Sequence, residues 1–286
     1  MRLSVSLEPV APLQATANRW HSSAVDPASP EIVSRKVKGL LNKLTMKKFD
    51  SISDEIIALV NKSEKENDGR TLIQVVQLVH EWATHEARWS EMYARLCQKI
   101  MEQISPLVQD RGSRNAEGKP IAGGQLFRKY LLNRCQDDFE RGWMEKEETA
   151  VAATRVVEHQ AAAKAANDLI KDEDKAKQWQ GLIKFLGELF KLQMLTQGIM
   201  HECVKKLLTN VEAPEEVEIV GLCTLLTSIG DILDTPKARA HMDVYFSRMK
   251  QLVENQSVSP RIQFMLQVRI PLTSRPSSVT TSKGRH

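Results

Sequence analysis

The stretch from Val33 to Phe49 constrains this chain most, because its apolar residues recur with the period of a helix. They fall at Val33, Val37, Leu40, Leu41 and Leu44. This spacing is typical of an amphipathic helix that packs one face on a core. We predict a first helix over 31–44, followed at once by a second over 46–65 that Thr45 caps.

The polar face of the same stretch is basic. It carries Arg35, Lys36, Lys38, Lys43, Lys47 and Lys48, opposed only by Glu31 and Asp50. Such a face is often a solvated surface, and its functional interpretation is contact with RNA phosphates or with an acidic partner. Aromatic residues for base stacking are absent around it, so we expect any RNA binding to be electrostatic and salt-sensitive rather than sequence-specific.

The rest of the chain reads as further helices in pairs. Aromatic residues make up only 5% of the chain, which favours helices over strands. The apolar spacing predicts these pairs: 31–44 with 46–65, 70–85 with 89–105, 125–140 with 145–170, 175–194 with 196–210, and 214–232 with 236–255. We therefore predict an all-α fold, an α-solenoid of about five antiparallel HEAT-type helix pairs that form a crescent.

Two segments flank this helical domain, which we place at 31–267. Residues 1–30 are rich in proline and serine and lack periodicity, so we expect an extended or disordered arm. Trp20 stands out in that arm, and it either packs on the domain's own surface or contacts a partner. Residues 268–286 are rich in serine, threonine and arginine, which predicts an atypical, disordered tail. Within the domain, 111–124 is rich in glycine and predicts a loop.

Motifs for catalysis and metal binding are missing from the sequence. His80 and His85 are spaced one residue too far apart for a zinc-binding pair on one helix face, and His201 and Cys203 also fall on different faces. We find no phosphate-binding glycine loop and no nucleophile motif. We therefore expect neither an enzyme nor a metal site nor a cofactor, and a solenoid offers long surfaces for binding instead.

The cysteines and the apolar runs bear on the compartment. Cys97, Cys135, Cys203 and Cys223 are scattered without a CxxC pair, which indicates small buried residues in a reducing environment. The sequence has neither a signal-peptide pattern nor an apolar run long enough to cross a membrane. We expect a cytoplasmic protein without a membrane partner.

Six separated strings resemble the middle domain of eukaryotic translation initiation factor 4G, in the same order. They are Leu41–Phe49 (LNKLTMKKF), Phe127–Cys135 (FRKYLLNRC), Ile183–Leu195 (IKFLGELFKLQML), His201–Cys203 (HEC), Leu222–Gly230 (LCTLLTSIG) and Ser259–Leu266 (SPRIQFML). The similarity covers about 31–267, and Asn18-Arg19-Trp20 extends it into the arm, whose variant looks fungal.

This resemblance implies a crescent of HEAT pairs that acts as a translation initiation scaffold. Members of the family bind the DEAD-box RNA helicase initiation factor 4A, and they contact mRNA and initiation factor 3. By resemblance, Leu41, Leu44 and Phe49 contact the helicase's C-terminal lobe, and Trp20 braces that interface. Because Leu41 and Leu44 also belong to the apolar stripe, they could serve by packing alone. The six basic residues named above are the candidates for weak RNA binding.

One departure and two alternatives accompany the resemblance. The family's cap-binding-protein site has a tyrosine followed by a leucine five residues later. Here the residues five after Tyr93, Tyr130 and Tyr245 are Gln98, Cys135 and Lys250. That motif is absent, so we interpret the chain, which we expect to be a monomer, as a fragment or a truncated product. The alternatives are a related HEAT-domain scaffold of a cap-binding or mRNA-decay complex, and a nuclear-transport adaptor.

Overall fold

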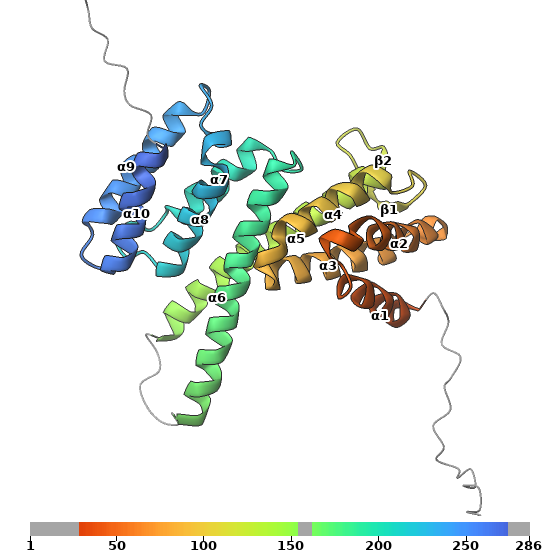
Figure 1. The fold of residues 1–286 in the computed structure, drawn as a ribbon, viewed down its shortest axis with the longest axis horizontal. Helices are drawn as coiled ribbons and strands as arrows, with labels where there is room; N and C mark the ends of the chain where they lie inside the picture. Colours follow the sequence, from red (N-terminus) through yellow and green to blue (C-terminus); the bar gives the residue numbers. More distant parts are fainter. Residues whose placement is uncertain (1–28, 154–161, 274–286) are drawn as a thin grey trace, which may run out of the picture.

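The computed structural model describes residues 29–153 and 162–273, with side chains over 29–142 and 173–269 (Figure 1). Ten α-helices and one small hairpin make up these ranges. Their bounds are α1 Pro30–Leu41, α2 Phe49–Asn61, α3 Arg70–His85, α4 Ser90–Gln103, β1 Gln109–Arg114, β2 Pro120–Ala122, α5 Gly123–Ala153, α6 Ala162–Lys191, α7 Gln197–Leu207, α8 Glu216–Leu233, α9 Arg239–Glu254 and α10 Pro260–Thr273. Short 3-10 turns, η1 Met46–Lys48, η2 Lys62–Lys65 and η3 Ala87–Trp89, precede or follow some of them.

The helices form a solenoid, as the sequence predicted. Consecutive helices pack in five pairs, α1 with α2, α3 with α4, α5 with α6, α7 with α8 and α9 with α10. Neighbouring pairs stack on one another, as their contacts show: α1 contacts α3, α2 contacts α4, α4 contacts α6, α6 contacts α8, and α8 contacts α10. The array runs from α1–α2 at one end to α9–α10 at the other, with α5 and α6 between them (Figure 1). Each pair thus buries its apolar face on the next.

The predicted division of the middle of the chain was wrong. Two long helices, α5 and α6, occupy the region to which we assigned 125–140, 145–170 and 175–194. Helix α5 continues through Gly142. The glycine makes room for the ring of Trp179 on α6, since a Cβ at Gly142 would lie 2.7 Å from a Trp179 ring carbon. Trp179 stacks on Phe139 with 5.2 Å between ring centroids. The third pair is therefore α5–α6, and the later pairs are α7–α8 and α9–α10.

The antiparallel hairpin β1–β2 occupies most of the predicted loop over 111–124 and begins just before it, at Gln109. Its turn is tightened by the Asn115 side chain, whose Oδ1 accepts hydrogen bonds from Glu117 N at 3.0 Å and Lys119 N at 2.8 Å. Gly118 supplies the left-handed residue that the turn needs, at φ 76°. The hairpin is fixed to the domain because Tyr130 Oη donates to Asp110 Oδ2 at 2.6 Å.

The C-terminal boundary also differs from the predicted one. Helix α10 runs past Gln267 to Thr273, so the predicted disordered tail does not begin at 268. Ile262 and Leu266 are buried and hold α10 on α8 and α9, which is why the helix forms. Residues 274–286 lie outside the described residues.

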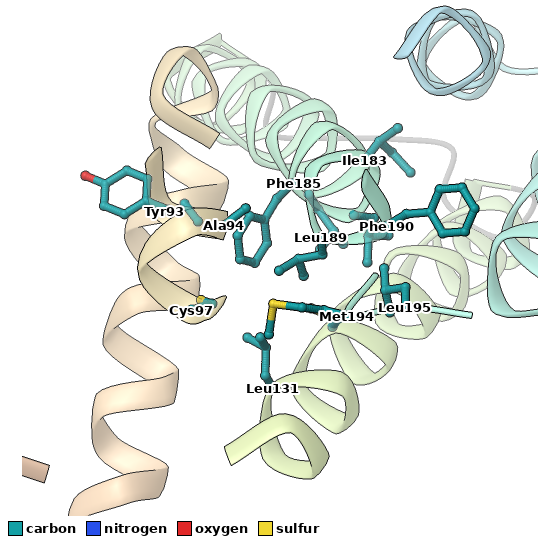
Figure 2. Close-up of a cluster of buried hydrophobic side chains, with 14 of the residues drawn as sticks. Tyr93, Ala94, Cys97, Leu131, Ile183, Phe185, Leu189, Phe190, Met194 and Leu195 are labelled. Atoms are coloured by element: carbon teal, nitrogen blue, oxygen red, sulfur yellow. The ribbon is translucent and has the colours of Figure 1, made fainter. Parts of the chain in front are cut away.

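The core runs through the whole array. Its central part joins α4, α5 and α6 with the segment after α6, as Figure 2 shows. This cluster includes Tyr93, Ala94, Cys97, Leu131, Ile183, Phe185, Leu189, Phe190, Met194 and Leu195. All four cysteines are buried and free, which confirms their interpretation as small apolar residues. The string Ile183–Leu195 thus forms much of the core around which the pairs pack.

Candidate binding surface at the first helix pair

Helix α1 is positioned by its N-terminal residues and its apolar stripe. Ser29 caps the helix, since its Oγ accepts a hydrogen bond from Ile32 N at 3.4 Å, and Pro30 is the first helical residue. Val33 and Val37 are buried against the rest of the array, and α1 contacts α2 and α3. The opposite face of α1 therefore points to solvent.

The three residues that the resemblance assigned to helicase contact lie inside this packing. Leu41, Leu44 and Phe49 are exposed by only 2%, 6% and 8%. Helix α1 ends at Leu41 rather than at 44, and the segment 42–48 turns the chain before α2 begins at Phe49. Thr45 starts η1 without a side-chain capping bond, so the predicted cap was wrong. The three buried side chains pack under the turn and fix its conformation. Trp20 lies outside the described residues.

Phe49 is covered by cations of α4. Arg95 Cζ lies 5.2 Å, and Lys99 Nζ 5.8 Å, from the centroid of the Phe49 ring. Lys99 Nζ also lies 3.0 Å from Asp50 Oδ1 and 2.8 Å from Asp54 Oδ1. Hydrogen bonding to Asp54, and to Asp50, raises the pKa of Lys99, so its ammonium stays charged. These contacts fasten the start of α2 to α4.

The turn exposes other residues in place of the buried three. Met46 is 51% exposed, and Lys47 and Lys48 beside it are exposed as well. Trp89, at the turn before α4, is 44% exposed. Helices α2 and α4 run in the same direction, because Phe49 faces Arg95 near their starts and Asn61 Oδ1 accepts from Ser105 N near their ends. The two turns therefore lie at the same edge of the array.

The six predicted RNA-binding cations are all exposed: Arg35, Lys36, Lys38, Lys43, Lys47 and Lys48. None of them forms an ion pair within the part of the chain that the structure describes. They do not form one stripe, because Arg35, Lys36 and Lys38 lie on α1, while Lys43, Lys47 and Lys48 lie in the turn that follows it. The surface thus offers unpaired positive charge on the outer face of α1 and again at the turn.

Sequence reasoning missed Met46, Trp89 and Arg95 as surface residues of this edge. Apolar periodicity assigned Met46 and Trp89 to helices, and periodicity does not tell a turn residue from a core residue. Their positions beside the helix ends, next to Lys47 and Arg88, were the available signal. Arg95 gave no signal, since its place over Phe49 depends on how α4 stacks on α2.

The histidines that the sequence singled out have separate environments. His80 is buried, and its Nδ1 lies 3.5 Å from Asp138 Oδ2, whereas His85 Nδ1 lies 2.7 Å from Glu81 O. Burial and the Arg134 charge lower the pKa of His80 to about 3, although Asp138 is close, because Asp138 also pairs with Arg134 at 3.2 Å. The ring is therefore neutral and structural.

His201 pairs with Tyr245, with 3.1 Å between Nδ1 and Oη. Over the described ranges, three or more histidine, cysteine or acidic residues do not gather as a metal site would require. Over the same ranges, every helix is too short or too polar to cross a membrane.

Comparison with known proteins agrees with the fold and with the strings quoted above. The sequence model of the MIF4G domain family matches residues 34–276 of this chain. The chain is 46% identical to eukaryotic translation initiation factor 4 gamma of the fission yeast Schizosaccharomyces pombe, over 92% of this chain and 19% of that protein. It is 36% identical to mouse eukaryotic translation initiation factor 4 gamma 3, over 94% of this chain and 17% of that protein.

The chain thus spans about a fifth of the length of these relatives. A solved structure, the MIF4G domain of Trypanosoma cruzi translation initiation factor EIF4G5, shares the fold with a TM-score of 0.51 at 16% identity, over 84% of this chain and 94% of that one. The fission-yeast relative supports the fungal assignment, and the resemblance to the middle domain of initiation factor 4G is confirmed. The chain belongs to the MIF4G domain family.

Proposed function

We propose that this chain is a translation initiation scaffold that binds the DEAD-box helicase initiation factor 4A, and that it also contacts mRNA and initiation factor 3. The observation that carries the proposal is the 46% identity to an initiation factor 4 gamma over 92% of the chain. Both relatives described above are named as initiation factors, which favours this function over a scaffold of mRNA decay or a transport adaptor. The chain acts by binding in the cytoplasm, as a monomer and without a catalytic group of its own.

The helicase surface in this proposal is the edge formed by the turn before α2 and the turn before α4. Met46 provides an exposed apolar contact, and Lys47 and Lys48 provide charge beside it. Leu41, Leu44 and Phe49 hold that turn in shape from within the core, so their role is to position Met46 and its neighbours. Trp20 remains a proposed brace for the same interface.

The proposed mechanism is a shift in the helicase's conformational equilibrium. A DEAD-box helicase alternates between open and closed arrangements of its two lobes, and a scaffold that contacts both lobes favours those in which they are near each other. The scaffold raises turnover only through its differential affinity for those arrangements. A preference of about 1–3 kcal/mol would change the population by roughly 5–150-fold. No reacting group from the scaffold is required.

The RNA contact in this proposal is electrostatic. Exposed, unpaired lysines and arginine on α1 and at the turn can approach phosphates without a new conformation. Because α1 carries no aromatic side chain beside its cations, binding there would depend on charge and not on base identity.

Titration calorimetry of purified helicase with this chain tests the surface. We expect Met46→Glu combined with Lys47→Glu to weaken binding at least about tenfold, because both change the exposed edge and leave the core intact. The matched control is Lys119→Glu on the β1–β2 hairpin. That hairpin pairs Asp110 with Asp68 beyond the end of α2, at the edge opposite the turn. Equal affinity of both variants would contradict the proposed surface.

A further inference from the structure

A groove runs between α1 and α2 on the outer face of the first pair. It has a volume of about 450 Å³ and is lined by residues of α1, of α2 and of the turns that follow these two helices. Its floor is aliphatic, since Leu40 and Leu59 are partly buried in it and Ala58 is exposed beside them. This face belongs to the end pair of the solenoid, where no further pair among the described residues covers it.

Gly39 keeps the groove open. A Cβ at this position would meet no atom within 4 Å, so a side chain here would project into free space. A glycine inside a helix is unfavourable relative to alanine, and nothing in the packing of α1 requires one here. Gly39 also borders a second depression, lined by Pro30, Lys38 and Gln74 among others, so the open surface continues across α1. The space suits an elongated occupant.

The rim of the groove is strongly basic. Arg35 and Lys36 line it from α1, and Lys43 and Lys62 line it from the turns after α1 and α2. Glu55 is the one carboxylate in the lining. Within the described residues none of these five groups forms an ion pair, so the excess positive charge is available to a ligand. The groove therefore combines an aliphatic floor with a positive rim.

We infer that this groove binds a short acidic peptide segment of a partner protein, with aliphatic side chains on Leu40 and Leu59 and carboxylates on the surrounding cations. Peptide grooves commonly gain affinity from apolar anchors and selectivity from charge at the rim. Single-stranded RNA fits less well, because its bases gain most from aromatic platforms and the lining has none. The groove shares Lys43 with the turn that carries Met46, but Met46, Lys47 and Lys48 do not line it, so the inference is distinct from the proposed helicase contact.

The test uses fluorescence anisotropy with three labelled probes on the full chain. The first is a peptide of about 15 residues with leucines at helical spacing and glutamates elsewhere. The second replaces each leucine by serine and keeps the charge, and the third is a uridylate oligomer of similar charge. Gly39→Gln fills the groove without changing the charge, and Lys36→Gln with Lys43→Gln removes rim charge. Lys47→Gln with Lys48→Gln removes the same charge outside the groove.

We expect the leucine peptide to bind the unmodified chain with a Kd below about 1 mM, and to lose at least about tenfold in affinity to Gly39→Gln and to the rim variant. The control variant should change its Kd by less than about threefold, and the serine peptide should bind at least about tenfold more weakly. Circular dichroism should show Gly39→Gln to be as helical as the unmodified chain and at least as thermostable.

Three outcomes would overturn the inference. The first is no binding of the leucine peptide. The second is equal binding of the leucine peptide to the unmodified chain and to a folded Gly39→Gln. The third is equal binding of the leucine peptide, the serine peptide and the uridylate oligomer, which would show a surface that recognises charge alone. The helicase affinity of Gly39→Gln is expected to stay unchanged, which separates this result from the proposed function.

Discussion

The ring of Phe49 lies beneath the guanidinium of Arg95, with 5.2 Å between Arg95 Cζ and the ring centroid. This contact joins the first residue of α2 to α4, and thus the first helix pair to the second. Cation–π contacts of this kind add to the stability that burial of the ring provides. Phe49, a residue expected at a partner interface, is therefore part of the core beneath the exposed turn.

Phe49→Ala should lower the free energy of unfolding by about 3–5 kcal/mol, because it removes a buried ring and leaves a cavity. Phe49→Leu keeps most of the volume and should cost about 1 kcal/mol. Urea denaturation followed by circular dichroism measures both. If Phe49→Ala unfolds like the unmodified chain and yet loses the helicase, the ring itself contacts the partner.

Gly142→Ala should destabilise the α5–α6 pair even though alanine favours helices. The added Cβ would lie 2.7 Å from the ring of Trp179, so the ring must move from its place on Phe139. We expect a loss of about 1–3 kcal/mol in thermal or urea unfolding. Gly39→Ala is the matched control, because its Cβ meets no atom, and it should stabilise by about 0.5–1 kcal/mol. If both substitutions changed the stability in the same direction, the packing of Trp179 against Gly142 would be refuted.

Protonation of His80 in the unfolded chain should make the folded chain less stable at acid pH. Its folded-state pKa is lowered to about 3, so below about pH 6.5 the unfolded chain binds a proton that the folded chain does not. Neutral His80 contributes fully to the free energy of unfolding above pH 6.5. That free energy then falls by about 1.4 kcal/mol per pH unit as the pH falls towards 3. Comparing urea unfolding of the unmodified chain and His80→Gln at about pH 7 and about pH 5 isolates this effect from other groups.

The variant should lose less stability over that interval than the unmodified chain. Equal losses would mean that the His80 ring is protonated in the folded state. In that state Asp138, 3.5 Å away, would dominate over burial.

RNA affinity should depend on salt and on the exposed cations together. Lys38→Gln with Lys48→Gln should reduce the slope of log affinity against log salt concentration by about 1.4, since each single-strand phosphate contact contributes about 0.7. Filter binding of a uridylate oligomer over a range of salt measures the slope. Lys119→Gln on the hairpin, paired with Glu117 at 3.0 Å, is the control and should leave it unchanged. A slope that none of these variants changes would place the RNA elsewhere.

The sequence predicted the architecture well where apolar periodicity and helix ends coincide. Helices α3 and α4 lie close to the expected 70–85 and 89–105, since Glu86 follows the first and Ser105-Pro106 follows the second. It failed between 140 and 145, where the expected break lies inside α5, and where Gly142 gives room to the ring of Trp179 on α6. The hairpin was missed because the side-chain bonds of Asn115 and Asp110, rather than strand periodicity, order it.

The binding role of the Leu41–Phe49 string remains a prediction. The structure shows where the string lies, at the end of α1 and in the turn before α2, with exposed basic residues around it. Periodicity already placed Leu41 and Leu44 on the apolar stripe, and the structure shows that Phe49 joins them in the core. Which residues remain exposed, Met46 above all, depends on how α2 stacks on α4, and the local sequence does not contain that information.

The most direct test of the account is the RNA-dependent ATPase activity of purified initiation factor 4A, measured with and without this chain. Met46→Glu with Lys47→Glu is measured beside it, after circular dichroism confirms an unchanged helix content. We predict that the unmodified chain raises the rate by roughly 5-fold or more and that the folded variant does not. Failure of the folded, unmodified chain to stimulate would contradict the scaffold function, and full stimulation by the variant would contradict the proposed contact at the first turn.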